Sequence, residues 1–164
     1  MNLALTAPQP LNASHLLAEF KCGEDSLDDW LKRRALSNQA SGASRTFVAV
    51  NSAGEVLGCY AMAAGAVTHQ MATSAVKRNM PDPVPVLVLA RLAIDQRVQG
   101  IKLGAALLQD AVNRAVSVSK NAGVRALLVH ALNEQAKNFY LHYGFQESPH
   151  DPLILLLRLN NTKV

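Results

Sequence analysis

The sequence predicts one mixed α/β domain in which helices flank a central sheet. Three observations lead to this fold class. The 164 residues have the length of a single domain. Apolar residues make up 49% of the chain, which is enough for a packed core. Apolar positions recur at helical spacing in some segments and in short continuous runs in others, and the two kinds alternate along the second half of the chain.

An acidic, helical part is expected over residues 1–44. A short helix is predicted over 12–20. A second helix is predicted from Asp25 or Ser26, which can cap it, to Gly42. Its apolar face should consist of Leu27, Trp30, Leu31 and Ala35, and its outward face of Asp28, Asp29, Lys32 and Arg33.

The core is expected over residues 45–160. A turn at 51–54 should join strands 46–50 and 56–64 into a hairpin. Residues 69–79 are polar and can include a short helix, whereas the three prolines of 80–85 exclude one. The remaining predicted elements are strand 86–94, helix 104–120, strand 125–131, helix 134–143 and strand 153–159.

Charge is unevenly distributed along the chain. Residues 1–31 hold one Lys and five acidic residues, a net charge of −4, whereas residues 32–80 have a net charge of +5. The basic residues of this second segment cluster at Lys32–Arg34 with Arg45, and at Lys77–Arg78. Such clusters are either a solvated helix surface or a site for a polyanion.

Composition excludes several other classes of protein. Cys22 and Cys59 form neither a disulfide framework nor a zinc cluster, and we expect two buried thiols and no metal. No apolar run is long enough to cross a membrane, and residues 1–9 do not look like a secretory signal. We therefore expect a cytoplasmic protein.

The segment LARLAIDQRVQGIKLGAALL, residues 89–108, runs from a predicted strand through a Gly-containing turn into a helix. A turn of this kind presents unpaired amides at a helix N-terminus, where phosphate binds. The segment lacks the Gly-Lys-Ser/Thr of a P-loop and the GxGxxG of a dinucleotide fold.

Together with the later pattern N..A..FY..YGF, which begins at Asn133, this segment resembles the GNAT superfamily of acetyl-CoA-dependent N-acetyltransferases. The resemblance implies a sheet that is splayed at an acetyl-CoA cleft. It implies that pantetheine pairs with Leu92, Ala93 and Ile94, bonds to Asn133 and packs on Phe139. The residues implied for the pyrophosphate are Gln99, Gly100, Ile101, Lys102, Leu103, Gly104 and Ala105.

Lys102 departs from the family's pyrophosphate signature, which is Gln or Arg, two residues, Gly, one residue, and Gly or Ala. Counted from Gln99, Lys102 takes the first Gly position and Gly104 the second. Counted from Arg97, Gly100 is first and Lys102 second. We prefer the Gln99 register, which keeps the loop next to the helix. Lys102 crowds the phosphate or pairs with it, so we predict that it alters acetyl-CoA affinity.

The resemblance also implies that Tyr140 protonates the leaving thiolate. A phenol with a reference pKa near 10 is protonated at neutral pH; the alternative is a tyrosine that only packs on its helix. No general base stands out, since Glu134, Asp95 and the five histidines, among them His69, His130 and His142, are candidates only by residue type. An α-amine, with a reference pKa of about 7.7 to 8.0, could attack without a base.

Three longer segments resemble GNAT toxins of bacterial toxin–antitoxin modules, the TacT type, over nearly the whole chain. They begin at Leu5 (LTAPQPL…HLLAEFKCGEDSLDDWL), Val76 (VKRNMPDPVPVLVLARLAID) and Val124 (VRALLVHALNEQAKNFYLHYGF). The resemblance implies acetylation of the α-amine of aminoacyl-tRNA. It also implies neutralisation by a ribbon-helix-helix antitoxin, operator DNA bound only through that complex, and a homodimer.

The basic residues fit a tRNA substrate, because phosphate contacts dominate nucleic-acid affinity. The candidates are Lys32, Arg33, Arg34, Arg45, Lys77, Arg78 and Arg91. Two alternatives stay open at this point: a GNAT enzyme that acts on a small amine or a protein N-terminus, and an inactive GNAT fold that serves as a binding module.

Overall fold

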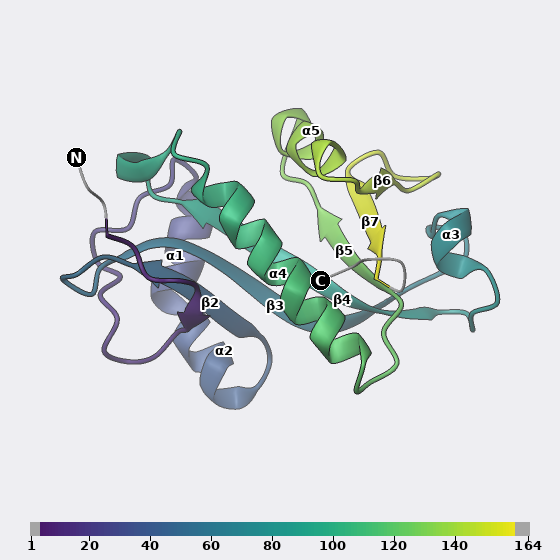
Figure 1. Ribbon diagram of the computed structural model, residues 1–164, viewed down its shortest axis with the longest axis horizontal. Helices are drawn as coiled ribbons and strands as arrows, with labels where there is room; N and C mark the ends of the chain where they lie inside the picture. Colours follow the sequence, from purple (N-terminus) through teal and green to yellow (C-terminus); the bar gives the residue numbers. More distant parts are fainter. Residues whose placement is uncertain (1–3, 160–164) are drawn as a thin grey trace. The chain divides into compact units, whose positions relative to one another are not determined.

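The computed structural model describes residues 4–159 (Figure 1). These residues form two compact units. The first contains the chain up to Ala63 together with Arg91–Ala111, and the second contains Ala64–Ala90 together with the chain from Val112. Strand β3 (Val56–Val67), strand β4 (Val84–Ile94) and helix α4 (Leu103–Ser119) each belong partly to both units. The single domain expected over residues 1–164 stays a prediction.

The first unit is built on the predicted hairpin. Strand β2 (Arg45–Val50) pairs antiparallel with β3, and β1 (Gln9–Pro10) pairs antiparallel with β2. The turn between β2 and β3 ends at Gly54, whose φ of 83° is in the left-handed region that glycine tolerates. Fully buried apolar side chains of this unit include Leu31, Val48 and Val56. The hairpin prediction is therefore confirmed.

Two helices replace the single one expected between Asp25 and Gly42. Helix α1 (Asp25–Arg33) and helix α2 (Ala35–Ser41) meet at Arg34, where the backbone leaves the helical region (φ −120°, ψ −32°). Leu31 and Ala35 lie on either side of this break, and both are fully buried. The break therefore keeps the apolar face on the core. Gly42 ends α2 with a φ of 83°, as predicted.

Three expectations for the acidic N-terminal part are wrong. Residues 12–20 are not helical, because Leu16 forms a bridge with Glu55: its N–H donates to Gly54 O (2.9 Å) and its carbonyl accepts from Val56 N (3.0 Å). The N-cap of α1 is Glu24 rather than Asp25 or Ser26. Asp28 does not face outward; it is 6% exposed and accepts a hydrogen bond from Cys22 N.

The second unit contains a parallel pair and two antiparallel pairs of strands. Residues Val86–Leu89 of β4 pair parallel with β5 (Ala126–His130). Strand β7 (Ile154–Arg158) is antiparallel to β5, and β6 (Gln146–Glu147) is antiparallel to β7 (Figure 1). The strand order of the seven-stranded sheet is β1-β2-β3-β4-β5-β7-β6. The predicted mixed sheet flanked by helices is confirmed.

Two short helices of the second unit carry residues that matter below. Helix α3 (Ser74–Lys77) is the short helix expected in the polar stretch, and Val76 on it is buried with Val84, Val86 and Ala126. Helix α5 (Glu134–His142) follows β5, as predicted. A 3-10 turn, η1 (Gln96–Val98), precedes α4 in the first unit.

The two cysteines are free thiols, Cys59 buried and Cys22 half-buried. Burial raises the pKa of Cys22 to about 11 and that of Cys59 to about 12, so both are protonated at neutral pH. Within residues 4–159, no helix combines the length and the apolar character that a membrane span requires.

Candidate functional site

The loop between β4 and α4 has the geometry expected of a phosphate-binding turn. Gly100 and Lys102 have positive φ values, 88° and 64°. Ala106 N donates to Lys102 O (3.2 Å), so Lys102 closes the first turn of α4. The amides that follow Lys102 lie at the N-terminus of this helix, where intrahelical acceptors run out. Lys102 thus adopts a left-handed φ of 64°, which is strained for a residue with a Cβ and which glycine tolerates.

A buried carboxylate fixes the start of this loop. Asp95 is 1% exposed and accepts hydrogen bonds from Arg97 N (2.9 Å), Arg97 Nε (2.9 Å), Arg97 Nη2 (3.1 Å) and Lys21 N (3.0 Å). Burial alone would raise the pKa of Asp95, but the bonds from Arg97 and the Lys21 amide hold it below its usual value. Asp95 therefore stays ionised, and its two oxygens are engaged as acceptors of these structural hydrogen bonds.

Gln99 is also engaged with the protein. Its Nε2 group donates to Ile94 O (3.0 Å), at the end of β4, and to Cys22 O (3.1 Å). Gln96 N donates to Lys21 O (2.8 Å) close by. Gln99 thus joins the loop to the segment before α1, and its side-chain nitrogen is engaged within the protein.

The end of β4 differs from its beginning. The parallel pairing of β4 with β5 stops at Leu89 and Val129, before β4 ends at Ile94. Arg91 has a φ of 60°, which interrupts the regular strand there. In the following residues, Ala93 is buried whereas Leu92 and Ile94 are half-buried. This segment is the edge that the sequence assigned to pantetheine.

Tyr140 lies in an aromatic cluster of the second unit. Its ring is 5.3 Å from that of Phe139 and 5.4 Å from that of Phe145, and Phe139 also meets Tyr143 edge-on at 5.1 Å. Tyr140 is 8% exposed, and burial raises its pKa to about 12. The phenol is therefore protonated throughout the physiological range, which is the state that a proton donor needs.

Asn133 begins α5. Its Oδ1 accepts a hydrogen bond from Ala136 N (2.9 Å), so it is the N-cap of the helix. Because this cap engages the side-chain oxygen of Asn133, the side-chain NH2 group is the part that can donate to a ligand. The sequence predicted Asn133 as a ligand but not as a cap.

The candidates for a general base have ordinary surroundings. Glu134 and His142 are exposed on α5, and His130 is exposed at the end of β5. The Nε2 atom of His69 lies 3.0 Å from Met80 O and 2.9 Å from Pro81 O, so it is engaged as a donor to these carbonyls. None of these groups has the buried, activated environment of a catalytic base.

The predicted basic residues divide between the units. Lys32, Arg33 and Arg34 are exposed at the end of α1. Arg45 donates through Nη1 to Gln39 O (2.6 Å), and Arg91 lies over the ring of Trp30 at 5.3 Å. All five belong to the first unit, whereas Lys77 and Arg78 belong to the second.

The structure groups the predicted cofactor residues in the same two sets. Leu92 to Ala105 lie in the first unit, and Asn133, Phe139 and Tyr140 in the second. Reasoning from the sequence gave no functional role to two residues that are used below. Trp30 was assigned only to the core, and Arg125 only to a strand. The sequence offered one signal for each residue: Trp30 is a lone aromatic on a predicted helix, and Arg125 is a cation at the start of an apolar strand.

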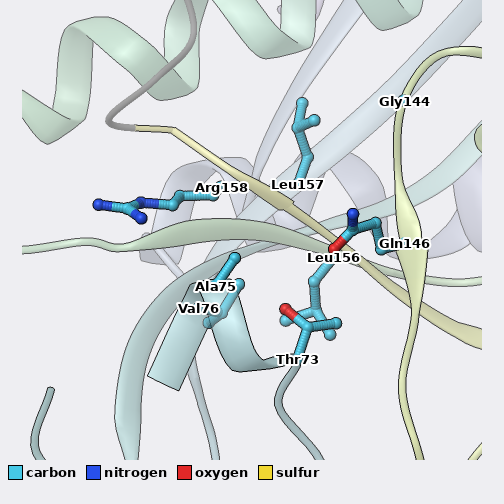
Figure 2. Close-up of a pocket in the computed structure, with 8 residues that line it drawn as sticks. All are labelled: Thr73, Ala75, Val76, Gly144, Gln146, Leu156, Leu157 and Arg158. Carbon is cyan, nitrogen blue, oxygen red and sulfur yellow. The ribbon is translucent and has the colours of Figure 1, made fainter. Parts of the chain in front are cut away.

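A pocket of about 250 Å³ opens in the second unit between α3 and β7. Figure 2 shows Thr73 and Val76 from the α3 side, and Leu156 and Arg158 from β7. Its walls contain none of the sequence-predicted site residues and no carboxylate. We therefore do not place the chemistry in this pocket.

Residues 42–147 match the model of the acetyltransferase (GNAT) domain. The tRNA-acetylating toxin of Mycobacterium tuberculosis (strain ATCC 25618 / H37Rv) is 47% identical over 158 residues, which cover 96% of this chain and 95% of that protein. The structure of AtaT complexed with acetyl-methionyl-tRNAfMet is similar at a TM-score of 0.87, with 28% identity and 95% of each chain covered. A tyrosine-to-phenylalanine mutant of AtaT, bound to the C-terminus of the antitoxin AtaR and acetyl-CoA, gives a TM-score of 0.81 at 28% identity, covering 95% of this chain and 94% of that one.

Proposed function

Since the chain belongs to the GNAT acetyltransferase family, we propose that it transfers the acetyl group of acetyl-CoA to the α-amino group of aminoacyl-tRNA and so blocks translation. The observation that carries the proposal is the 47% identity, over 96% of the chain, to a tRNA-acetylating toxin. The similarity to AtaT bound to an acetylated methionyl-tRNA supports the same substrate class.

In the proposed reaction, the neutral α-amine attacks the thioester carbonyl and forms the new C–N bond. The C–S bond then breaks, and the Tyr140 O–H donates its proton to the leaving thiolate. The tetrahedral nitrogen loses its extra proton to water, which leaves the neutral amide, and the Tyr140 phenolate regains a proton from water. An α-amine loses its own proton with a reference pKa of about 7.7 to 8.0. Positioning alone can then supply the attack, in keeping with the ordinary surroundings of Glu134 and the histidines.

For acetyl-CoA, we assign the pyrophosphate to the backbone of Gln99–Ala105. Lys102 adds an ammonium group next to it, and the first turn of α4 adds amides. Ile101, which is 52% exposed, contributes only its backbone to this assignment. Pantetheine is assigned to the edge Leu92–Ile94, to the amide group of Asn133 and to the ring of Phe139.

For tRNA, we assign phosphate contacts to Lys32–Arg34, Lys77, Arg78 and Arg91, which are exposed or half-exposed. Arg45 is the weakest of the candidates, because its guanidinium already holds the last turn of α2. Binding through phosphates releases counterions, so the affinity for charged tRNA should fall steeply as salt rises. An affinity that salt does not change would contradict the assignment.

The decisive experiment is incubation with labelled acetyl-CoA and a pool of charged and uncharged tRNA. Label on charged tRNA alone is the expected result, and the labelled amino acid identifies the preferred substrate. Label on a small amine or a protein N-terminus, with none on tRNA, would replace this function with another GNAT activity. Failure to transfer acetyl to any acceptor would leave a binding module.

We also propose that a ribbon-helix-helix antitoxin neutralises the protein in the cytoplasm and that the complex binds operator DNA. The support is the similarity to AtaT bound to the C-terminus of its antitoxin AtaR. Co-expression tests it: growth arrest by this chain should be relieved by the antitoxin, and a Tyr140→Phe variant should not arrest growth.

A further inference from the structure

Lys77 and Arg78 lie in a loop that the chain fixes from two sides. We call residues 68–83, which include α3, the α3 loop. A four-residue helix such as α3 does not form on its own, because the free-energy cost of nucleating a helix exceeds the gain from a single hydrogen-bonded turn. Its last carbonyls also lack intrahelical donors. Side chains from elsewhere must therefore supply the order that this loop shows.

Arg125 supplies three hydrogen bonds to the α3 loop. Its Nε donates to Val76 O (3.1 Å), and its Nη2 donates to Ala75 O and to Arg78 O (3.2 Å each). These three carbonyls surround Lys77 in sequence, so the backbone that carries the basic pair is held by one guanidinium. A planar fork can meet several carbonyls in this way, whereas an ammonium group is a single point charge.

The main chain of Arg125 is fixed in turn by the sheet. Its N–H donates to Pro85 O (2.8 Å) of β4, and its carbonyl accepts from Leu159 N (3.1 Å), next to β7. The guanidinium thus extends from the sheet to the α3 loop. Val76 between them is 1% exposed, so the loop is packed as well as hydrogen-bonded.

His69 holds the other side of the loop. Its Nε2 contacts the carbonyls of Met80 and Pro81, and its backbone N–H donates to Asp82 Oδ1 (3.1 Å). Lys77 and Arg78 therefore lie between two fixed stretches of backbone. Their side chains, half-buried and exposed, point from a loop whose main chain is held in place.

The side chain that binds these carbonyls, Arg125, is positively charged. Burial lowers the pKa of Arg125, and repulsion from Arg158 and Arg78 lowers it further. A neutral amide side chain offers only two donors on one nitrogen and carries no charge. A guanidinium here instead concentrates positive charge around the loop, an arrangement that a bound polyanion would stabilise.

We propose that Arg125 is a positioning residue for tRNA: it fixes the Lys77–Arg78 backbone so that both cations meet phosphates of the acceptor substrate. This role rests on the proposed function. Arg125 is not assigned a contact with tRNA and acts through the α3 loop. Removing it should therefore resemble removing Lys77 and Arg78, and should leave acetyl-CoA binding unchanged.

The test is a double-mutant cycle on the full chain, with Arg125→Gln, the pair Lys77→Gln/Arg78→Gln, and all three changes together. Arg125→Gln should raise the KM for charged tRNA by about tenfold, with kcat within about twofold, and should flatten the salt dependence of binding by about two phosphate contacts, those of Lys77 and Arg78. The triple variant should equal the pair variant. Lys120→Gln, which removes an exposed cation at the end of α4, is the matched control and should change neither constant.

Each other outcome contradicts the proposal. Additive effects in the triple variant would make Arg125 a direct phosphate contact, and a matching loss of acetyl-CoA affinity would make its role merely structural. If Arg125→Gln does not fold, Arg125→Lys decides: a raised KM of smaller size is expected, and a wild-type KM overturns the proposal. If the wild type acetylates charged tRNA and Arg125→Gln is normal, only the positioning role fails; if the wild type does not, the proposed function fails.

Discussion

The two parts of the chain that we assign to acetyl transfer, one in each unit, are held by different physical means. In the first, the loop before α4 is fixed by polar bonds to Asp95 and Gln99, several of them from a segment more than seventy residues away. In the second, Tyr140 is fixed by aromatic packing on Phe139 and Phe145. Aromatic packing is stabilised by the fit between ring shapes, whereas a buried carboxylate is stabilised by its charge interactions and by each hydrogen bond that it accepts. Removing one polar atom should therefore have opposite consequences in the two units.

Tyr140→Phe should give the largest effect on rate. The ring and its packing remain, so the melting temperature and the acetyl-CoA dissociation constant should stay near wild type. Loss of the proton donor should lower kcat by about 10²-fold or more, the usual contribution of general acid catalysis. Steady-state kinetics with calorimetric acetyl-CoA binding would measure both, and wild-type kcat in this variant would remove Tyr140 from the mechanism.

The pH profile sharpens this prediction. With a pKa of about 12, Tyr140 stays protonated while the acceptor amine deprotonates near pH 8. The rate should rise through pH 8 and show no decline due to Tyr140 below about pH 11. Tyr140→Phe should lower the whole profile without shifting its midpoint. A basic limb near pH 9 that the variant lacks would contradict the assignment.

Asp95→Asn should give the reverse pattern. The substitution removes the charge and one of the acceptors that Arg97 and Lys21 N use, and it leaves donors unpaired in a buried place. We expect a loss of about 2–3 kcal/mol in the free energy of unfolding and weaker acetyl-CoA binding. Urea unfolding measures the first quantity. Glu19→Gln, at an exposed position of the same unit, is the control and should change stability little.

The sign of the pH dependence follows from the lowered pKa of Asp95. A carboxylate whose pKa is lower in the folded state stabilises the fold fully above its unfolded pKa of about 3.9, and this contribution is lost as pH falls through the folded pKa. The stability gap between wild type and Asp95→Asn should therefore be widest near pH 7 and should narrow below about pH 4. A gap that is constant with pH would show that the charge is unimportant.

The same contrast explains what could be predicted from sequence. The hairpin, α4, β5 and α5 follow from local apolar periodicity, and Tyr140 follows from a local motif. Asp28 is held by a local bond from Cys22 N, six residues away, which apolar periodicity does not show. A further failure is at a long-range bond: Leu16 pairs with Glu55 instead of continuing a helix. Arg125 was missed for the same reason, since its partners on α3 lie almost fifty residues away. A local pattern does not contain such partners.

Lys102→Gly tests the departure from the family signature. Glycine relieves a positive φ that costs about 1 kcal/mol for a residue with a Cβ, but it gives up an ammonium next to the assigned pyrophosphate. We expect a small change in stability and a three- to tenfold rise (about 1 kcal/mol) in the acetyl-CoA dissociation constant, an effect that shrinks at high salt. An unchanged dissociation constant would show that Lys102 plays no part in binding.

The smallest effect is expected for the contact between Arg91 and the ring of Trp30. This contact tests the contrast between polar bonds and aromatic packing, because it places an aromatic ring against a cation in the first unit. Arg91 lies 5.3 Å from the ring of Trp30 at a positive φ, so the ring restrains a cation assigned to tRNA. In a cycle of Trp30→Leu and Arg91→Gln, the coupling in unfolding free energy should be about 0.5–1 kcal/mol. Additive losses would mean that the contact stabilises nothing. A coupling as large as the effect of Asp95→Asn would mean that the first unit, like the second, depends on an aromatic ring to hold its functional residues.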